Sequence, residues 1–403
     1  MTEKFSVTRS PQGGFAPSYR SGVAPFRMMN IMRRVAELTA EGKPVISLSA
    51  GEPSGGAPTG VAEAARNIHD SGVPLNYTPT LGIHPLREAI AEHYRRWYDL
   101  DIPLEQVAVT TGSSGGFVVG FLAAFDVGDR VALPRPGYAA YRNVLQALGC
   151  EVVEIPAGAE QGFVPSIDTL EQANVRGLVL ASPNNPTGTM VDASRMLHLT
   201  SWCDAHGVRL FSDEIYHGVT YSTRGVSSWE SSRTGVVVGS FSKYWGMPGW
   251  RLGWLLLPVD LVSSVTALSS SVSLSPPTAA QHAAVEAFSE DSYAENDARV
   301  EEFADTRSLI FSRATELGFW DAAPADGAFY FYARPPQAMM DRYGTATVYA
   351  QALLESHYVA VTPGLDFDPI DGEGFIRISF AAGQDAVSEA LDRIQHFHEE
   401  NSY

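Results

Sequence analysis

Residues 236–253 read VVVGSFSKYWGMPGWRLG. The apolar run at the start of this stretch predicts a short buried strand, so Lys243 lies just past a strand end and not on an exposed helix face. A lysine in such a place loses hydration, which lowers its pKa and leaves a neutral amine able to attack a carbonyl. The alternative is an ordinary solvated lysine at the surface. Arg251, the hydroxyls of Ser240 and Ser242, and the nearby glycines are groups that suit an anion such as a phosphate.

The composition of the chain limits its partners. Its 403 residues are enough for two domains with buried cores. The chain has 28 Lys and Arg against 46 Asp and Glu, a net charge of −18, which opposes binding to nucleic acid or to an anionic membrane. We find no signal-peptide pattern and no run of about 18 apolar residues that would span a membrane. With only Cys150 and Cys203, we expect no disulfide framework and a reducing, cytoplasmic location.

Short apolar runs alternate with helical patterns along most of the chain. The predicted strands are residues 45–48, 107–111, 130–134, 177–181, 208–212, 236–238, 254–257, 328–332 and 375–380. The predicted helices include residues 30–42, 61–71, 85–98, 117–125, 192–206, 277–288, 293–317, 345–357 and 384–400. This alternation predicts an α/β fold with a mainly parallel sheet that helices cover on both faces. Such sheets bind ligands beyond the carboxyl ends of their strands.

Two of the turns that follow predicted strands suit a flat, anionic ligand. The strand at 107–111 ends at Gly112-Ser113-Ser114-Gly115-Gly116, and a helix is predicted from Phe117. A strand, a Gly/Ser turn and a helix present backbone N–H groups and a helix dipole to an anion. The turn after the strand at 130–134 carries Tyr138, whose ring could stack on a flat heterocycle. Tyr141, which apolar helix positions follow, is expected to pack in the interior.

Four further residues carry polar groups at predicted strand ends or inside a strand. Asn185 follows the strand at 177–181 and could donate its amide to a phenolate oxygen. Asp213, directly after the strand at 208–212, needs a cationic partner if it is buried, and Tyr216 follows it closely. A helix-capping aspartate with a packed tyrosine is the structural alternative. Arg377 lies within an alternating strand, where a bidentate carboxylate would suit it, and a structural salt bridge is the competing interpretation.

These motifs together resemble a known family. Ser240-x-Ser242-Lys243 followed by Gly249-Trp250-Arg251-x-Gly253 resembles the lysine signature of the class I/II aminotransferases, which use pyridoxal phosphate (PLP). Asn184-Asn185-Pro186-Thr187-Gly188 and Asp213-Glu214-x-Tyr216 resemble two further motifs of this family. Gly51-Glu52-Pro53, and Tyr77 ahead of Gly82 and Leu86-Arg87-Glu88-Ala89, also follow its pattern. The resemblance runs from about Val45 to Phe380, with every motif in family order.

The resemblance implies roles for individual residues. Lys243 would form the Schiff base with PLP, and Asp213 would face the ring nitrogen. Asn185 and Tyr216 would contact the 3-oxygen, and Lys243, Asp213 and Tyr216 would form the catalytic set. The other residues implied to bind the cofactor are Gly112, Ser113, Ser114, Tyr138, Ser240, Ser242 and Arg251, with Tyr77 of the partner subunit in a homodimer with shared active sites. Arg377, Gly51 and Asn185 would bind the substrate, and no metal is expected.

The resemblance also implies PLP-dependent transferase fold type I, with a smaller α+β domain beside the large sheet. We expect an irregular tail at residues 1–25, an N-terminal part of the small domain at 26–58, the large PLP-binding domain at 59–292 and the rest of the small domain at 293–403.

The implied function is transfer of an amino group between an L-amino acid and a 2-oxo acid. A PLP-dependent C–S (β) lyase, or another PLP enzyme acting on amino acids, would begin with the same removal of the α-proton and remains an alternative. A PLP-binding regulator lacking its DNA-binding domain is a remote alternative, because it needs a basic DNA-binding segment that this acidic chain does not show. The identity of the amino donor and of the oxo-acid acceptor is left open by these motifs.

Overall fold

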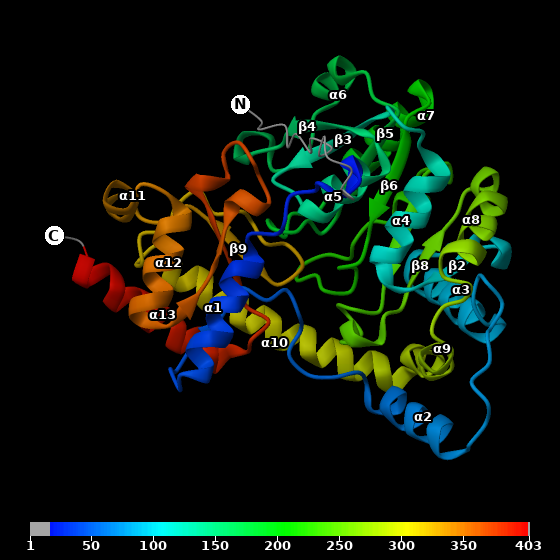
Figure 1. Ribbon diagram of the computed structural model, residues 1–403, viewed down its shortest axis with the longest axis horizontal. Helices are drawn as coiled ribbons and strands as arrows, with labels where there is room; N and C mark the ends of the chain where they lie inside the picture. Colours follow the sequence, from blue (N-terminus) through cyan, green and yellow to red (C-terminus); the bar gives the residue numbers. More distant parts are fainter. Residues whose placement is uncertain (1–16, 402–403) are drawn as a thin grey trace, which may run out of the picture.

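The computed structural model describes residues 17–401 of the chain. Most of the predicted N-terminal tail therefore lies outside the described residues, and the part that is described contains one short 3₁₀ turn at Tyr19–Ser21. Two parts lie side by side: a large sheet with its helices, and a smaller group of strands and helices that contains the C-terminus (Figure 1).

Within residues 17–401, the largest sheet has seven strands in the order β2-β8-β7-β6-β5-β3-β4. Neighbouring strands pair in parallel except at β8, which is antiparallel to both β2 and β7. The strands are β2 (Val107–Thr110), β3 (Arg130–Arg135), β4 (Glu151–Pro156), β5 (Gly177–Ala181), β6 (Arg209–Asp213), β7 (Val236–Ser240) and β8 (Gly253–Leu256). The predicted α/β fold with a mainly parallel sheet is confirmed.

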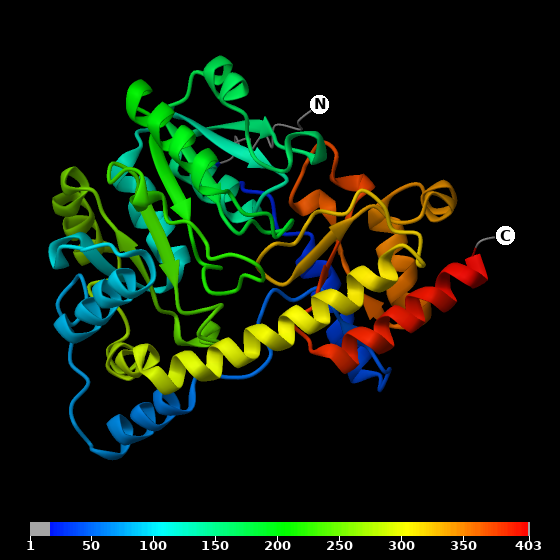
Figure 2. The ribbon, with the colours of Figure 1, turned by 180° about the vertical axis from the view of Figure 1, so that it is seen from behind.

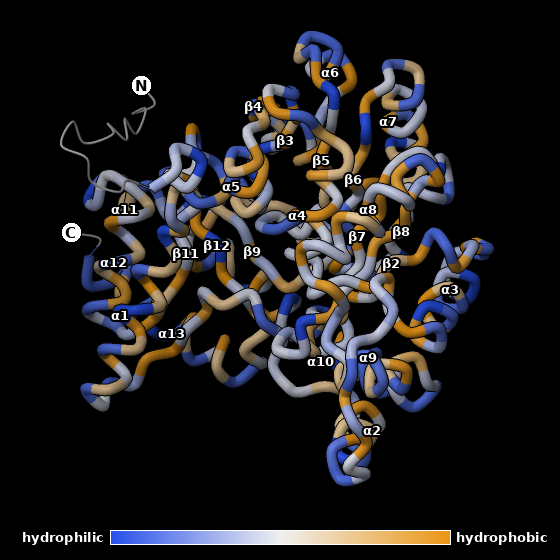
Figure 3. The backbone as a smooth tube through the Cα atoms, turned by 45° about the vertical axis from the view of Figure 1, so that its right-hand side comes forward, coloured by the Kyte–Doolittle hydropathy of each residue, from blue (hydrophilic) through white to orange (hydrophobic). Residues whose placement is uncertain are grey.

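Helices cover both faces of this sheet because successive side chains of each strand point to opposite faces. Val179 and Phe211 pack in one core cluster with helices from one face, whereas Leu178 and Leu210 pack in another cluster with helices from the other. The first group of helices is α4 (Gly112–Ala124), α5 (Ala139–Leu148) and α8 (Val259–Val272), and the second is α6 (Ile167–Ala173) and α7 (Ala193–His206). Figure 3 shows these strands as mostly hydrophobic, as burial on both faces requires.

The smaller part contains two further sheets. An antiparallel sheet has the order β11-β12-β9, formed by β11 (Thr362–Pro363), β12 (Ile376–Ser379) and β9 (Tyr330–Ala333). Near the N-terminus, β1 (Ile46–Ser47) pairs in parallel with β10 (Val359–Ala360). The helices of this part are α1 (Met28–Ala40), α11 (Gln337–Tyr343), α12 (Ala346–His357) and α13 (Gln384–Asn401).

Three helices lie along the lower side of the molecule, and one of them joins its two parts (Figure 1). Helix α10 (Glu290–Ala314) runs beneath both the large sheet and the smaller part (Figure 2). Helices α2 (Thr59–Asp70) and α9 (Thr278–Ala284) pack on each other near its start, and α3 (His84–Tyr98) covers the edge at β2.

We propose that the domains divide at residues 26–58, 59–292 and 293–403. The pairing of β1 with β10 supports grouping 26–58 with the C-terminal part, and the boundary at 292 falls in the first turn of α10.

The two largest differences between the observed and the predicted helix starts are at α4 and α10. The Gly/Ser segment that was predicted as a turn is the first turn of α4, which begins at Gly112 and not at Phe117. Gly112 itself has a φ of +68°, a conformation that favours glycine, and the following glycines continue the helix. Helix α10 begins three residues earlier than predicted because the Ser289 side chain accepts a hydrogen bond from the Ser292 N–H.

Gly239 in β7 tests the packing of the central sheet. A Cβ at this position would collide with the indole of Trp254 on β8, which is buried and donates to the Tyr94 hydroxyl at 3.1 Å. We expect Gly239→Ala to lower the free energy of unfolding by about 1–3 kcal/mol, because the indole must move. Gly56→Ala is the matched control, since a Cβ there meets nothing within 4 Å. Urea unfolding at fixed protein concentration measures both, and equal midpoints would contradict this account of the packing.

Candidate active site

Lys243 lies in the turn that follows β7, as predicted, and is partly buried. Its Nζ donates to the Gly51 carbonyl at 2.6 Å and lies 5.6 Å from the centre of the Tyr216 ring. Burial lowers the pKa of Lys243 to about 8, while the charge of Glu52 acts in the opposite direction. An amine with this pKa gives up its proton far more readily than a solvated lysine does.

Asp213 ends β6 and is only 2% exposed. Its Oδ1 accepts from the Ile215 N–H at 3.1 Å, and its Oδ2 accepts from the Tyr141 hydroxyl. Burial raises the pKa of Asp213 to about 6, and the bonds from Tyr141 and Ile215 and the charge of Lys243 limit this rise. A carboxylate held this way is suited to a cationic ligand, because the described bonds leave it without a cationic hydrogen-bond partner.

Tyr141 does more than the sequence interpretation assigned to it. The prediction that it packs in the interior is confirmed: its ring is buried and lies 5.0 Å from Phe117, centre to centre. Its hydroxyl, however, reaches the carboxylate of Asp213, which lies 72 positions further along the chain. No local sequence pattern around Tyr141 predicts this hydrogen bond, because the bond forms only when β6 and α5 meet at the sheet edge.

The start of α4 and Arg251 form a group suited to binding an anion. The backbone N–H groups of Gly112, Ser113 and Ser114 belong to the first turn of the helix, where they have no partner within the helix. The guanidinium of Arg251 lies so close to Gly112 that a Cβ there would collide with it, and its Nη1 donates to the Pro248 carbonyl at 2.8 Å. The positive helix end and the guanidinium thus lie together, as a phosphate requires.

Ser240 and Ser242, on either side of Phe241 just before Lys243, are buried beside the start of α4 and Arg251. The Ser240 hydroxyl accepts from the Ser242 N–H at 3.1 Å, which fixes the turn that carries Lys243. Gly253 allows β8 to begin against the start of α4, because a Cβ there would lie 2.7 Å from the Ser113 nitrogen. The predicted phosphate-binding residues on either side of β7 and β8 are therefore brought together.

Arg377 lies on β12 of the smaller part, is 2% exposed and faces the ends of the large sheet. Its Nη1 donates to Asn185 Oδ1 at 2.8 Å and its Nη2 to the Ser49 carbonyl at 2.6 Å. Its Nε has no hydrogen-bond partner among the described residues. Neutral oxygens therefore orient this guanidinium, and no carboxylate of residues 17–401 bonds it, so within the described part of the chain the predicted alternative of a structural salt bridge is wrong.

Tyr216 shares a hydrogen bond of 2.6 Å with Tyr330, which the sequence interpretation did not single out. The Tyr330 ring lies 4.4 Å from the guanidinium of Arg377, and its hydroxyl occupies the space that a side chain at Gly51 would need. Glycine is thus required at position 51 for a packing reason. Of the predicted substrate-binding residues, Gly51 and Arg377 both lie against Tyr330, and Asn185 bonds Arg377.

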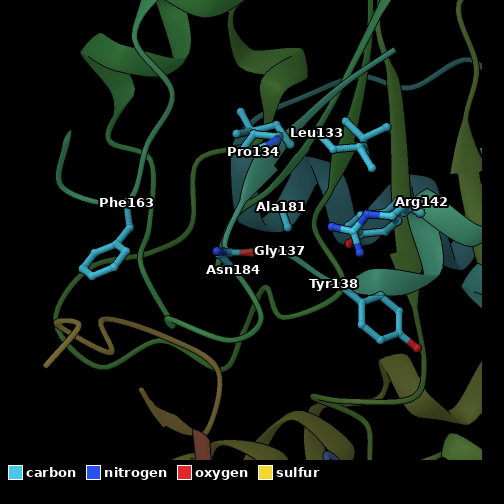
Figure 4. Close-up of a pocket in the computed structure, with 11 residues that line it drawn as sticks. Leu133, Pro134, Gly137, Tyr138, Arg142, Phe163, Ala181 and Asn184 are labelled. Carbon is cyan, nitrogen blue, oxygen red and sulfur yellow. The ribbon is translucent and has the colours of Figure 1, made fainter. Parts of the chain in front are cut away.

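Tyr138 lies in the turn after β3, as predicted, beside the end of β6. Its ring is 5.5 Å from that of Tyr141 and stacks at 6.1 Å on Phe26 of the N-terminal segment. Behind this turn is a small pocket bordered by Leu133, Asn184 and Phe163, and the ring of Tyr138 points away from Leu133 (Figure 4). Lys243 and Asp213 do not border this pocket.

Tyr77 is 80% exposed and lies on the irregular segment between α2 and α3. An exposed tyrosine of this kind is available to a neighbouring molecule.

Among the described residues, no group of three or more His, Cys, Asp or Glu side chains could hold a metal ion. The helices of residues 17–401 include none that is long and apolar enough to cross a membrane.

The groups brought together fit PLP. An amine with a lowered pKa, a buried carboxylate and an anion-binding helix start match an aldehyde, a basic ring nitrogen and a phosphate on one molecule. The collision that a side chain at Gly112 would cause shows that the backbone must remain open beside Arg251. We propose these three groups as the cofactor contacts.

Comparison with known proteins gives a consistent result. The model of the family described as "Aminotransferase class I and II" matches residues 43–394. The valine–pyruvate aminotransferase of Mycobacterium tuberculosis is 45% identical over 93% of this chain and 96% of its own length. An aspartate aminotransferase of Pyrococcus horikoshii is 30% identical over 90% of this chain and 93% of its own length.

Solved structures agree with the sequence comparisons. An aminotransferase from Mycobacterium tuberculosis superimposes with a TM-score of 0.92 and 43% identity, covering 96% of this chain and all of that one. The aspartate aminotransferase of Thermus thermophilus, solved with maleate, gives a TM-score of 0.88 and 31% identity, covering 95% of this chain and all of its own. This chain therefore belongs to the class I and II aminotransferases, a family of PLP-dependent enzymes that transfer amino groups between amino acids and 2-oxo acids.

Proposed function

We propose that this aminotransferase moves the amino group between L-valine, or a similar apolar L-amino acid, and pyruvate. The observation that carries this proposal is the 45% identity to a valine–pyruvate aminotransferase over nearly the whole chain. Relatives with aspartate or aromatic amino acids in their names are 29–32% identical. The steep drop in identity favours the chemistry of the more similar relative.

Arg377 is proposed to bind the carboxylate that the two substrates share. Its Nε has no described partner and its Nη1 bonds one neutral oxygen, so donors remain for a carboxylate, whereas Nη2 bonds the Ser49 carbonyl and contacts the sulfur of Met28. Because Asn185 and Ser49 fix the guanidinium plane, the carboxylate would bind in one orientation. That orientation would direct the Cα–H of the amino acid towards Lys243.

Lys243 is proposed to carry the proton during the reaction. When bound, PLP supplies an aldehyde that accepts the amino group and a ring that withdraws electrons from Cα. The amine of Lys243, with its pKa lowered to about 8, is suited to remove the proton from Cα of the amino acid. In the reverse half of the reaction, the same amine would return a proton to Cα of the second substrate. Asp213 would hold the proton on the ring nitrogen, since burial favours pairing its charge with a cation.

The remaining residues are proposed to hold the cofactor in place. Asn185 and Tyr216 would donate to its 3-oxygen, and the ring of Tyr138 would stack on it. The proposed phosphate contacts are Gly112, Ser113, Ser114, Ser240, Ser242 and Arg251, and Tyr77 of the partner subunit. The exposure of Tyr77 supports a homodimer with shared sites, and the free cysteines Cys150 and Cys203 are in keeping with a cytoplasmic enzyme.

The Lys243 assignment can be tested without ambiguity, because the chain has only three lysines, Lys4, Lys43 and Lys243. Borohydride reduction of the PLP enzyme should fix the cofactor on Lys243, as peptide mapping will show. Lys243→Ala should lower kcat by about 10³-fold or more, because both covalent attachment and proton transfer are lost. Lys43→Ala, at an exposed lysine, is the control and should keep full activity. Label on Lys4 or Lys43 would refute the assignment.

The pH dependence of cofactor uptake tests the environment of Lys243. Only the unprotonated amine attacks an aldehyde, so uptake should speed up as the pH rises through the pKa of Lys243. Since burial lowers that pKa to about 8, the rate of reconstitution of the apoenzyme with PLP should reach half its maximum near pH 8. Absorbance between pH 6 and 10 measures this. A midpoint at the usual lysine pKa, above 10, would show that the amine is solvated.

A substrate panel tests the proposed reaction. With pyruvate as acceptor, L-valine should give a kcat/KM at least about tenfold above that of L-aspartate, because one misplaced charge in an apolar pocket costs more than 1.4 kcal/mol. Chromatography of the products should show L-alanine and the 2-oxo acid of valine in equal amounts. Release of ammonia and pyruvate from cysteine-like donors, without alanine, would indicate a lyase instead.

A further inference from the structure

Three consecutive residues, Asp366, Phe367 and Asp368, bind three different segments around Arg377. They lie in the loop between β11 and β12, where a 3₁₀ turn spans Gly364–Asp366. Asp366 Oδ1 accepts from the Arg27 N–H at 3.0 Å and Oδ2 from the Met28 N–H at 2.8 Å. Because Met28 begins α1, Asp366 caps that helix from more than 330 positions away in sequence.

Phe367 and Asp368 tie the same loop to the large sheet. The Phe367 carbonyl accepts from the Gly137 N–H at 2.9 Å, and its buried ring lies 4.8 Å from the guanidinium of Arg377. Both carboxylate oxygens of the buried Asp368 accept from Arg135 Nη1, at 3.1 and 3.0 Å. The loop cannot move without breaking bonds to β3, to the turn that carries Tyr138 and to α1.

The contacts place apolar groups directly beside the guanidinium of Arg377. Met28 Sδ lies 3.8 Å from Arg377 Nη2, and the guanidinium lies 4.4 Å from the centre of the Tyr330 ring and 4.8 Å from that of Phe367. The segment before Met28 is also held, since Phe26 stacks on Tyr138 and the Ala24 carbonyl accepts from Asn143 Nδ2 at 2.9 Å. A carboxylate bound to Arg377 would therefore have its substituent next to Met28 and Phe367. We call the side chains of these two residues the apolar wall.

The charges near Lys243 do not favour an acidic side chain. The charged groups with the largest effect on Lys243 are Glu52, Arg377, Asp213 and Arg251. Arg251 lies at the start of α4 and Arg377 is assigned to the shared carboxylate, so neither is free for a second one. Glu52 would repel a second carboxylate. Apolar surface and a like charge together select against a dicarboxylic substrate.

We propose that Asp366, Phe367 and Asp368 form a clamp that sets substrate selectivity by holding the apolar wall beside Arg377. Met28 and Phe367 are the specificity-determining residues, because they border the space for the substrate side chain. Asp366 and Asp368 are positioning residues that act through the wall. The enzyme then accepts compact apolar side chains and rejects acidic and large aromatic ones. This inference rests on the proposed role of Arg377 in binding the substrate carboxylate.

The test compares selectivity in the PLP-loaded enzyme and in five variants. The readouts are kcat/KM for L-valine, L-phenylalanine and L-aspartate with pyruvate, and the dissociation constants of 3-methylbutanoate, 3-phenylpropanoate and succinate by fluorescence. These acids lack the amino group, so their binding does not depend on turnover. Met28→Ala should raise the phenylalanine-to-valine ratio of kcat/KM at least about tenfold, because it removes the side chain that limits size. Phe367→Leu, which keeps the site apolar, should shift the same ratio in the same direction.

Asp366→Asn tests the clamp without touching the wall. It removes one of the two acceptors at the start of α1, so KM for L-valine should rise severalfold while kcat and PLP affinity change little. Asp366→Glu, which keeps both acceptors, should restore KM, an outcome that general destabilisation would not produce. Asp371→Asn is the matched control, since it removes an exposed carboxylate of the same loop that bonds Arg135 but not α1. Its KM should stay within about twofold of the wild-type value.

The possible outcomes separate the two proposals. Unchanged ratios of both kcat/KM and ligand affinity in Met28→Ala and Phe367→Leu would overturn the clamp, even in an active transaminase. If wild-type enzyme transfers no amino group from valine but the variants still shift the affinity ratio of 3-phenylpropanoate to 3-methylbutanoate, the proposed reaction fails and the clamp stands. Wild-type preference for succinate over 3-methylbutanoate would also overturn the clamp.

Discussion

The loss of water around the amine of Lys243 is the constraint on which the site depends. No single element removes this water. The turn after β7 brings the amine to the sheet edge, and the Gly51 carbonyl, 192 positions away, receives its hydrogen bond. Gly51 can approach only because it has no side chain where the Tyr330 hydroxyl lies. The low pKa of the lysine is therefore a property of two parts of the fold packed together, and it would vanish if they separated.

Three arginines near the site, Arg135, Arg251 and Arg377, have different hydrogen-bond partners and therefore different roles. Arg135 bonds two carboxylates, Asp368 and Asp371, so its charge is neutralised and it acts as a structural tie. Among residues 17–401, the hydrogen-bond partners of Arg377 are all neutral, the oxygens of Asn185 and Ser49 and the sulfur of Met28, so its orientation is fixed while its charge remains for a ligand. Arg251 is held by the Pro248 carbonyl beside a positive helix end. The partner set of each arginine, more than its burial, separates binding groups from structural ones.

The sequence predicts the positions of site residues that lie close to a strand in the chain. It does not predict hydrogen bonds between residues that are far apart in the chain. Asp213 ends a strand, and Lys243 and Asn185 each follow one closely, so the strand pattern and the turn residues place them at one sheet edge without further information. The strand β4 was not predicted, because its charged and partly exposed residues lack an uninterrupted apolar run. Tyr330 was read only as part of a strand, although its hydroxyl joins Tyr216 and its ring covers Arg377. The bonds of Tyr141 and Asp366 link segments 72 and more than 330 positions apart, and no local periodicity encodes such pairings.

The site lowers the stability of the protein that carries it. Lys243 has a pKa of about 8 in the folded chain against 10.5 as its ordinary value, so between these pH values the unfolded chain binds more protons and stability rises with pH. Below pH 8 the cost of the buried ammonium is present in full. Asp213 has a pKa of about 6 against 3.8, so the folded chain binds more protons in this range and stability falls as pH rises from 3.8 to 6. At neutral pH both groups therefore destabilise the fold, and each cost falls when a ligand supplies the missing partner. A cofactor that bonds the amine and offers a cation to the carboxylate would relieve both, so its binding would stabilise the fold as well as complete the chemistry.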